Sequence, residues 1–188
     1  MVEIEVIRSR RKTLALEVLD DGRVRIRAPL RCSKVKMRRF VEEHSAWIER
    51  KLQDAQRRRA EIEQVVPLTE EELRALQNRG KAVFPERAAY FAPLVGVRYG
   101  RVSVRKQRSK WGSCSTAGNL SFNCLLLLAP PEVLDYVVVH ELCHRLEMNH
   151  SPRFWAEVRR VCPDYERCRR YLREHGSALM ARLPEKEK

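Results

Sequence analysis

Residues 130–144 of this 188-residue chain read PPEVLDYVVVHELCH. The prolines and the glutamate that follows them predict a helix beginning near Pro131, because proline fits the first helical turn and acidic side chains complement a helix N-terminus. Apolar residues surround this helix on nearly all sides. We therefore expect a helix buried in the middle of a domain.

The end of this stretch carries the pattern H-E-x-x-H, as His140, Glu141 and His144. Helical residues four apart lie one turn apart on the same face, so the two imidazoles can share one metal ion. Glu141 falls beside that face, where it can accept a proton from an activated water without taking a coordination position. Because three fixed positions recur by chance in long helices, the surrounding sequence has to support the pattern.

Residues 149–152, NHSP, predict that one helix stops and another starts. Asn149 tolerates the left-handed backbone conformation that often ends a helix. Ser151 can cap the next helix, and Pro152 suits its first position. A sharp reversal of the chain is expected here.

His150 lies in this reversal, six residues after His144, which is the spacing of the longer zinc pattern H-E-x-x-H-x-x-G-x-x-H. Glu147 stands where that pattern has glycine, so we expect a different turn, with Asn149 in the left-handed conformation. His150 is the preferred third metal ligand, and Glu157 on the following helix is the alternative. The competing interpretation is that the histidines are ordinary core and surface residues.

The composition is that of an ordinary globular protein, with 44% hydrophobic and 34% charged residues. The N-terminus lacks a basic segment followed by an apolar one, and the longest apolar run, residues 125–129, is too short to span a bilayer. Six cysteines without a C-x-x-C pair argue against a disulfide framework and a thiolate zinc site. These features predict a soluble, cytoplasmic protein with no membrane association.

Positive charge is in excess, because 38 Lys and Arg against 25 Asp and Glu give a net charge of +13. Such an excess favours association with nucleic acid, nucleotides or other anions, although here it is spread over many elements. Only residues 105–111, RKQRSKW, concentrate basic side chains beside an aromatic one, which makes them a candidate anion-binding loop. Trp111 could stack on a base or wall a cleft, but a tryptophan in a short glycine turn more often fills the core.

Alternating apolar residues over residues 4–28 predict a β-hairpin with a turn at residues 20–22. The residues that alternate with the apolar ones in the last strand are arginines. They predict a basic outer face, made by Arg23, Arg25 and Arg27.

The hairpin is followed by a helix that Ser33 can cap and whose apolar residues recur at helical spacing. This helix runs into a polar stretch, residues 53–64, which is the expected domain boundary. We therefore expect an N-terminal hairpin and helix over residues 1–64 and a catalytic domain over residues 65–188.

The catalytic part is expected to open with a helix. Thr69 and Glu72 form a capping-box pattern at its start, and Gly80 and Pro85 predict kinks or breaks within it.

Two strands are expected next, in residues 97–104 and 119–123, both before the motif helix. A strand beside that helix can offer its free edge to an extended peptide. Residues 119–125 are therefore the candidate substrate edge, with an ordinary sheet strand as the alternative.

Several segments together resemble a known family. They are KWGSCS at residues 110–115, LAPP at 128–131, DYVVVHELCH at 135–144, NHS at 149–151 and FW at 154–155. In this combination the chain is similar to the YgjP-type zinc metallopeptidases, relatives of the SprT-like proteases, over most of its length.

The resemblance implies an α+β fold with a small zincin-like metallopeptidase core, to which the N-terminal hairpin and helix are added. It implies a single Zn2+ held by His140, His144 and His150, with Glu141 as general base. It also implies that the WGSC segment supports the site.

The sequence therefore predicts a metal-dependent hydrolase, with a zinc metallopeptidase acting on a peptide or protein substrate as the leading hypothesis. One alternative is a metal-dependent hydrolase of nucleoside triphosphates. Another is a nucleic-acid-associated module with a structural metal site, although structural zinc sites are usually closed by four protein ligands. For the oxyanion formed in hydrolysis, the sequence offers Tyr165, His175 and Arg153 without choosing among them.

Overall fold

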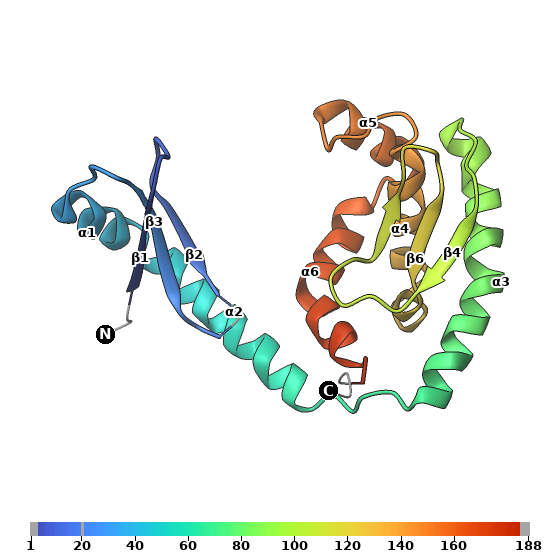
Figure 1. The fold of residues 1–188 in the computed structure, drawn as a ribbon, viewed down its shortest axis with the longest axis horizontal. Coiled ribbons are helices and arrows are strands. Elements are labelled where there is room, and N and C mark those ends of the chain that lie inside the picture. Colours follow the sequence, from blue (N-terminus) through green and yellow to red (C-terminus); the bar gives the residue numbers. More distant parts are fainter. Residues whose placement is uncertain (1–3, 20, 185–188) are drawn as a thin grey trace. The chain divides into compact units, whose positions relative to one another are not determined.

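The computed structural model describes residues 4–19 and 21–184, and the chain divides into two compact units, Met1–Gln64 and Val65–Lys188 (Figure 1). The described part of each unit contains one three-stranded sheet and several helices. The predicted α+β class is therefore confirmed. No described helix combines the length and the apolar character needed to cross a membrane.

The first unit is built around a mixed sheet. Its strands are β1 (Ile4–Ser9), β2 (Ala15–Val18) and β3 (Val24–Pro29), and its helices are α1 (Lys34–Glu43) and α2 (Ser45–Glu63). β2 and β3 form the predicted antiparallel hairpin, while β1 pairs with β3 in parallel. Gly22 adopts a φ of 83° in the hairpin turn, which glycine tolerates without strain. Asp20, in the predicted turn, lies outside the described residues.

The arginine face of this hairpin is not a free basic surface, which corrects the prediction. Arg25 Nε donates to Glu5 Oε2 at 2.9 Å, and Arg27 Nη2 donates to Glu17 Oε2 at 3.0 Å. Both glutamates lie opposite Arg25 in the strand register, because β1 and β2 flank β3. Cross-strand ion pairs therefore neutralise part of the positive charge.

The second unit holds the motif helix. Its helices are α3 (Glu70–Val95), the 3-10 helix η1 (Cys124–Leu128), α4 (Pro131–Cys143), α5 (Pro152–Val161) and α6 (Tyr165–Ala181), and its strands are β4 (Val102–Arg105), β5 (Gly112–Cys114) and β6 (Leu120–Asn123). α4 contacts the other four helices and strands β5 and β6 (Figure 1). It begins at Pro131 as predicted and is buried along most of its length, with His144 as its C-cap.

α3 is one continuous helix of 26 residues. It opens with the predicted capping box, because Thr69 Oγ1 accepts a hydrogen bond from Glu72 N and Glu72 Oε2 accepts one from Thr69 N. The breaks expected at Gly80 and Pro85 are absent, since apolar side chains are buried along the whole helix and outweigh local propensity. Gly80 lets β4 approach closely, because an added Cβ would lie 3.0 Å from Val104 Cγ1.

β6 is the central strand of the second sheet. It pairs with β4 in parallel and with β5 in antiparallel orientation. Residues 119–125 therefore offer no free strand edge to a peptide, and the predicted substrate edge is wrong. The strand that covers this edge, β5, has only three residues and was not predicted, because so short a strand shows no alternating pattern.

Asn123, at the end of β6, ties the sheet to the loop before β5. Its side chain is fully buried, and its Nδ2 donates to the backbone carbonyls of Gln107 at 2.6 Å and Lys110 at 3.0 Å. Its Oδ1 accepts from Leu125 N at 3.2 Å. A buried amide that is hydrogen-bonded at both ends fixes the course of this loop.

The chain reverses between α4 and α5 without a left-handed residue. No described residue other than glycine has a positive φ, so the conformation predicted for Asn149 is wrong. The turn instead begins with backbone hydrogen bonds between residues three apart. Arg145 N donates to Leu142 O at 2.9 Å, and Leu146 N donates to Cys143 O at 3.0 Å. Ser151 caps α5 as predicted, with its Oγ accepting a hydrogen bond from the backbone of the first turn.

Candidate metal centre and adjoining pocket

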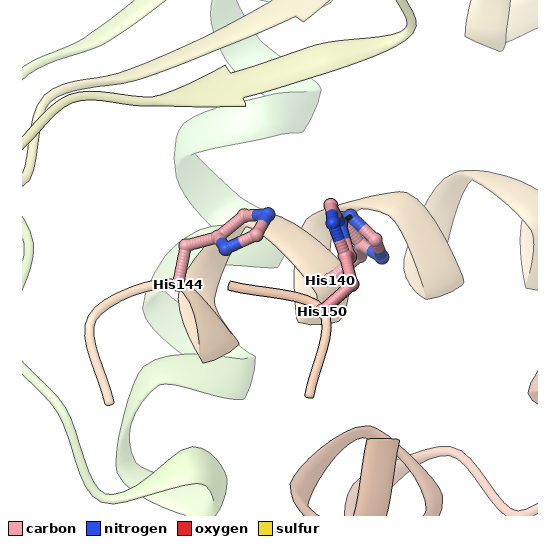
Figure 2. Close-up of side chains that lie close together, drawn as sticks. All are labelled: His140, His144 and His150. Atoms are coloured by element: carbon pink, nitrogen blue, oxygen red, sulfur yellow. Dashed lines mark hydrogen bonds between the residues drawn. The ribbon is translucent and has the colours of Figure 1, made fainter. Parts of the chain in front are cut away.

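Three histidine side chains converge at the end of α4 (Figure 2). Within the described residues, His140, His144 and His150 form the one group of three or more potential ligand side chains, and their ligand atoms lie within 4.8 Å of one another. His140 Nε2 and His150 Nε2 are 3.0 Å apart. Two nitrogens bound tetrahedrally to one zinc, each about 2.1 Å from it, would be about 3.4 Å apart. The three side chains are therefore close enough together to hold a single metal ion.

A hydrogen bond to the backbone orients His144. His144 Nδ1 lies 3.2 Å from the backbone carbonyl of Glu147, and a proton on this nitrogen leaves Nε2 free as a ligand. Glu147 is the residue that stands in place of the glycine of the longer zinc pattern. His140 Nδ1 is buried and finds no hydrogen-bond partner in the described part of the chain.

The surroundings of the two partly buried histidines, His140 and His144, favour the neutral form of each imidazole. Burial, followed by the nearby His144 and His150, lowers the pKa of His140 to about 3. Burial also lowers the pKa of His144. Neutral imidazoles can bind a metal without first losing a proton.

Phe154 supports all three imidazoles. Its ring centroid lies 4.9 Å from that of His140, 4.6 Å from that of His144 and 4.8 Å from that of His150. Phe154 is fully buried in the first turn of α5, where the Ser151 cap accepts from its backbone N–H. Sequence analysis identified Phe154 only as part of a family motif and predicted no role for it.

Glu141 lies beside the histidine group but is not part of it. Its side chain is buried, and this burial raises the pKa of its carboxyl to about 8, opposed by the positive charge of Lys110. The carboxyl packs against Gly112 of β5, where an added Cβ would lie only 2.6 Å from Glu141 Oε1. Glycine in the WGSC segment thus leaves room for the glutamate.

The substitution Gly112→Ala should lower turnover on the order of a hundredfold while metal content stays unchanged. The new methyl group would displace the carboxyl of Glu141, the general base expected from the sequence, and a shift of about 1 Å in a general base can have an effect of this size. Steady-state kinetics and elemental analysis on the same preparation check this. Ser113→Ala, the next position in β5, is the control and should keep the turnover of wild type. If Gly112→Ala also kept wild-type turnover, the close approach of Gly112 to Glu141 would be unimportant.

A pocket of about 360 Å³ adjoins the histidines, with His140 and Glu141 in its wall. α4, α6 and residues 110–112 enclose it. Trp111 lines the pocket and also packs against the buried core of this unit, both around α4 and around Leu73 and Leu125. It therefore has the predicted core role as well as the alternative role in the cleft.

The alternative third ligand stands apart from the centre. Glu157 Oε2 is paired with Arg160 at 2.9 Å, and Glu157 is not part of the histidine group.

The three predicted oxyanion donors do not line the pocket. Tyr165 is buried, and its hydroxyl donates to Glu166. Arg153 is exposed, and His175 packs against Tyr171.

Tyr136 and Arg169 line the pocket in place of the predicted donors. Tyr136 comes one helical turn before His140, and this spacing was a signal that sequence analysis overlooked. Arg169 comes from α6, and no local pattern links it to the motif.

The basic side chains of residues 105–110 do not all reach the pocket. Lys106 lies 3.8 Å from Glu70, and Arg108 donates to the carbonyl of Pro184. Of its basic residues only Lys110 lines the pocket.

Comparison with known proteins agrees with this geometry. A family model described as YgjP-like, metallopeptidase domain, matches residues 12–76 and 68–175. No curated protein matches the sequence significantly.

Two solved structures are similar to part of the chain. The metallopeptidase zymogen abylysin of Pyrococcus abyssi has 21% sequence identity and a TM-score of 0.44, and the match covers 48% of this chain and 93% of that one. The metallopeptidase zymogen jannalysin of Methanocaldococcus jannaschii has 20% identity and a TM-score of 0.38, with 44% and 89% covered.

Proposed function

This chain belongs to the YgjP-like metallopeptidase family, and on that premise we propose that it is a zinc-dependent peptidase with Glu141 as general base. The family makes it a metal-dependent hydrolase that acts on peptide or protein. The observation that carries the finer proposal is the convergence of three imidazoles beside a buried carboxyl that stays outside their group.

His140, His144 and His150 would hold the ion. Imidazole nitrogen is a preferred ligand of zinc, and three protein ligands leave the fourth tetrahedral position open, as in catalytic sites. When bound, the ion supplies Lewis acidity, which polarises the scissile carbonyl and makes the attacking water more acidic.

The remaining steps fall to side chains of this chain. Glu141 accepts the proton of the attacking water and then gives it to the leaving amine. Because Gly112 has no side chain, the Glu141 carboxyl can pack directly against the backbone of β5. The Tyr136 hydroxyl, which burial keeps protonated by raising its pKa to about 12, is the candidate donor to the oxyanion, because it lines the same pocket.

A hydrolase of nucleoside triphosphates is the second candidate, because Lys110, Arg169 and Arg173 line the pocket. A structural metal site in a nucleic-acid-associated module fits less well. Only three ligand side chains converge within the described residues, whereas structural zinc sites usually have four.

A side-by-side assay tests the proposal. Zinc-loaded protein is given a casein-like unfolded polypeptide or a nucleoside triphosphate, with Glu141→Gln protein as the blank. We expect proteolysis that stops with a chelator, returns with zinc and is absent in the blank. Triphosphate hydrolysis that vanishes in the blank, without any proteolysis, would instead establish the second candidate.

A further inference from the structure

Three positive charges surround the pocket beside the metal centre. Lys110 reaches it from the loop before β5, and Arg169 and Arg173 reach it from α6. His140 and Glu141 belong to the same wall, so a group bound here lies next to the reacting atoms. Glu141 is the one acidic residue among the described residues that line the pocket.

Apart from the Glu141 carboxyl, on which the charge of Lys110 acts, neighbouring carboxylates neutralise little of this charge. Within residues 4–19 and 21–184, Lys110 and Arg169 form no ion pair. The Arg169 guanidinium instead stacks on the ring of Trp155, 4.7 Å from its centroid. Arg173 lies 3.9 Å from its exposed neighbour Glu174, a long contact that solvent screens. The positive charge therefore remains available to a ligand.

The less exposed part of the pocket has an apolar portion beside the polar groups of Tyr136, His140 and Glu141. Trp111, Val137 and Leu172 line it and are buried or half-buried, whereas all three cations are exposed. Partly buried apolar side chains next to exposed cations suit a ligand with an aliphatic stem that ends in an anionic group. A peptide carboxylate has this form, either on an acidic side chain or at a free C-terminus. A nucleoside triphosphate has no such stem.

Resting on the peptidase function proposed above, we propose that Lys110, Arg169 and Arg173 form a subsite that binds a substrate carboxylate close to the scissile bond. The enzyme then selects peptides by an anionic group at this position. Guanidinium groups suit this role, because they remain charged and can bind a carboxylate through two hydrogen bonds.

Matched peptides test this selectivity. Internally quenched peptides carry Glu, Gln or Lys at one position at a time on either side of the cleaved bond. Each peptide is made in two forms, one with a free C-terminus and one with an amidated C-terminus. For zinc-loaded wild-type protein, kcat/KM should be about tenfold or more higher for the carboxylate-bearing peptide than for its neutral counterpart in one of two comparisons, Glu against Gln or free acid against amide. The difference should lie mainly in KM. The Glu and Gln pair reports a side-chain carboxylate, and the acid and amide pair reports a C-terminal one. Added salt should reduce the preference.

Variants assign the preference to the pocket. Arg169→Gln and Lys110→Gln should each bring the ratio of kcat/KM towards one, and Arg169→Glu should favour the Lys peptide. Arg170→Gln changes an exposed neighbour on α6 that does not line the pocket, so its ratio should equal that of wild type. Calorimetric binding of the same peptides to zinc-loaded Glu141→Gln protein should show the same preference without turnover.

The outcomes separate this inference from the function on which it rests. If all peptides are cleaved equally well, the subsite is refuted and the peptidase stands. If the preference survives in Arg169→Gln and Lys110→Gln, both shown to be folded by circular dichroism, the subsite is also refuted. If triphosphate is hydrolysed and no peptide is cleaved, both proposals fail.

Discussion

Glu141→Gln protein is expected to keep its zinc and its fold while losing peptide turnover by about a hundredfold or more, the usual scale for removing a general base. The amide has the shape of the carboxyl but cannot accept the proton of the attacking water. Stability should not fall, because a neutral amide in this buried position carries no charge that would have to leave water. Single-turnover kinetics, elemental analysis and thermal unfolding measure the three properties.

The matched control for this variant is Glu132→Gln. Glu132 lies on the same helix, α4, but it is exposed and pairs with Arg167 at 3.5 Å, away from the histidines. Its removal should leave turnover unchanged. Loss of zinc from Glu141→Gln would make Glu141 a ligand, and normal turnover would remove it from the mechanism.

Alanine at His140, His144 or His150 should reduce bound zinc from about one ion per chain to almost none, with turnover abolished. Each substitution leaves only two protein ligands, too few for a tetrahedral site that also keeps an open position. Elemental analysis of untagged protein measures the metal directly.

The control for the ligand variants is His44→Ala in α1's C-cap, where His44 Nδ1 lies 2.8 Å from the Phe40 carbonyl. This histidine is outside the group of three, so zinc content should be unaffected. Normal zinc retention in any one of the three ligand variants, with circular dichroism showing the native fold, would refute that histidine as a ligand.

Sequence predicted best the features that depend on a few neighbouring residues. Pro131 at the start of α4, Thr69 with Glu72 at the start of α3 and Ser151 before α5 each act within one helical turn, and the structure confirms all three. Such signals can be recognised without the tertiary fold.

The errors concern features that depend on packing between distant segments. Whether β6 is an edge strand depends on β5, which is too short to show a pattern. Pro85 fails to end α3 because apolar contacts along that helix outweigh its local preference. The pocket was missed for the same reason, since Arg169 joins it from α6 and has no fixed spacing from the motif.

The metal centre, together with Phe154, connects helix α4 to helix α5. His140 and His144 belong to α4 and its cap, whereas His150 lies in the reversal and packs against Phe154 in the first turn of α5, so one ion would join both sides of the turn. Ligand binding stabilises whatever structure creates the site, by about 2.7 kcal/mol when free ligand is a hundredfold above Kd. Zinc supply would then govern how firmly α5 docks on α4, and with it the local resistance of this corner to unfolding and proteolysis.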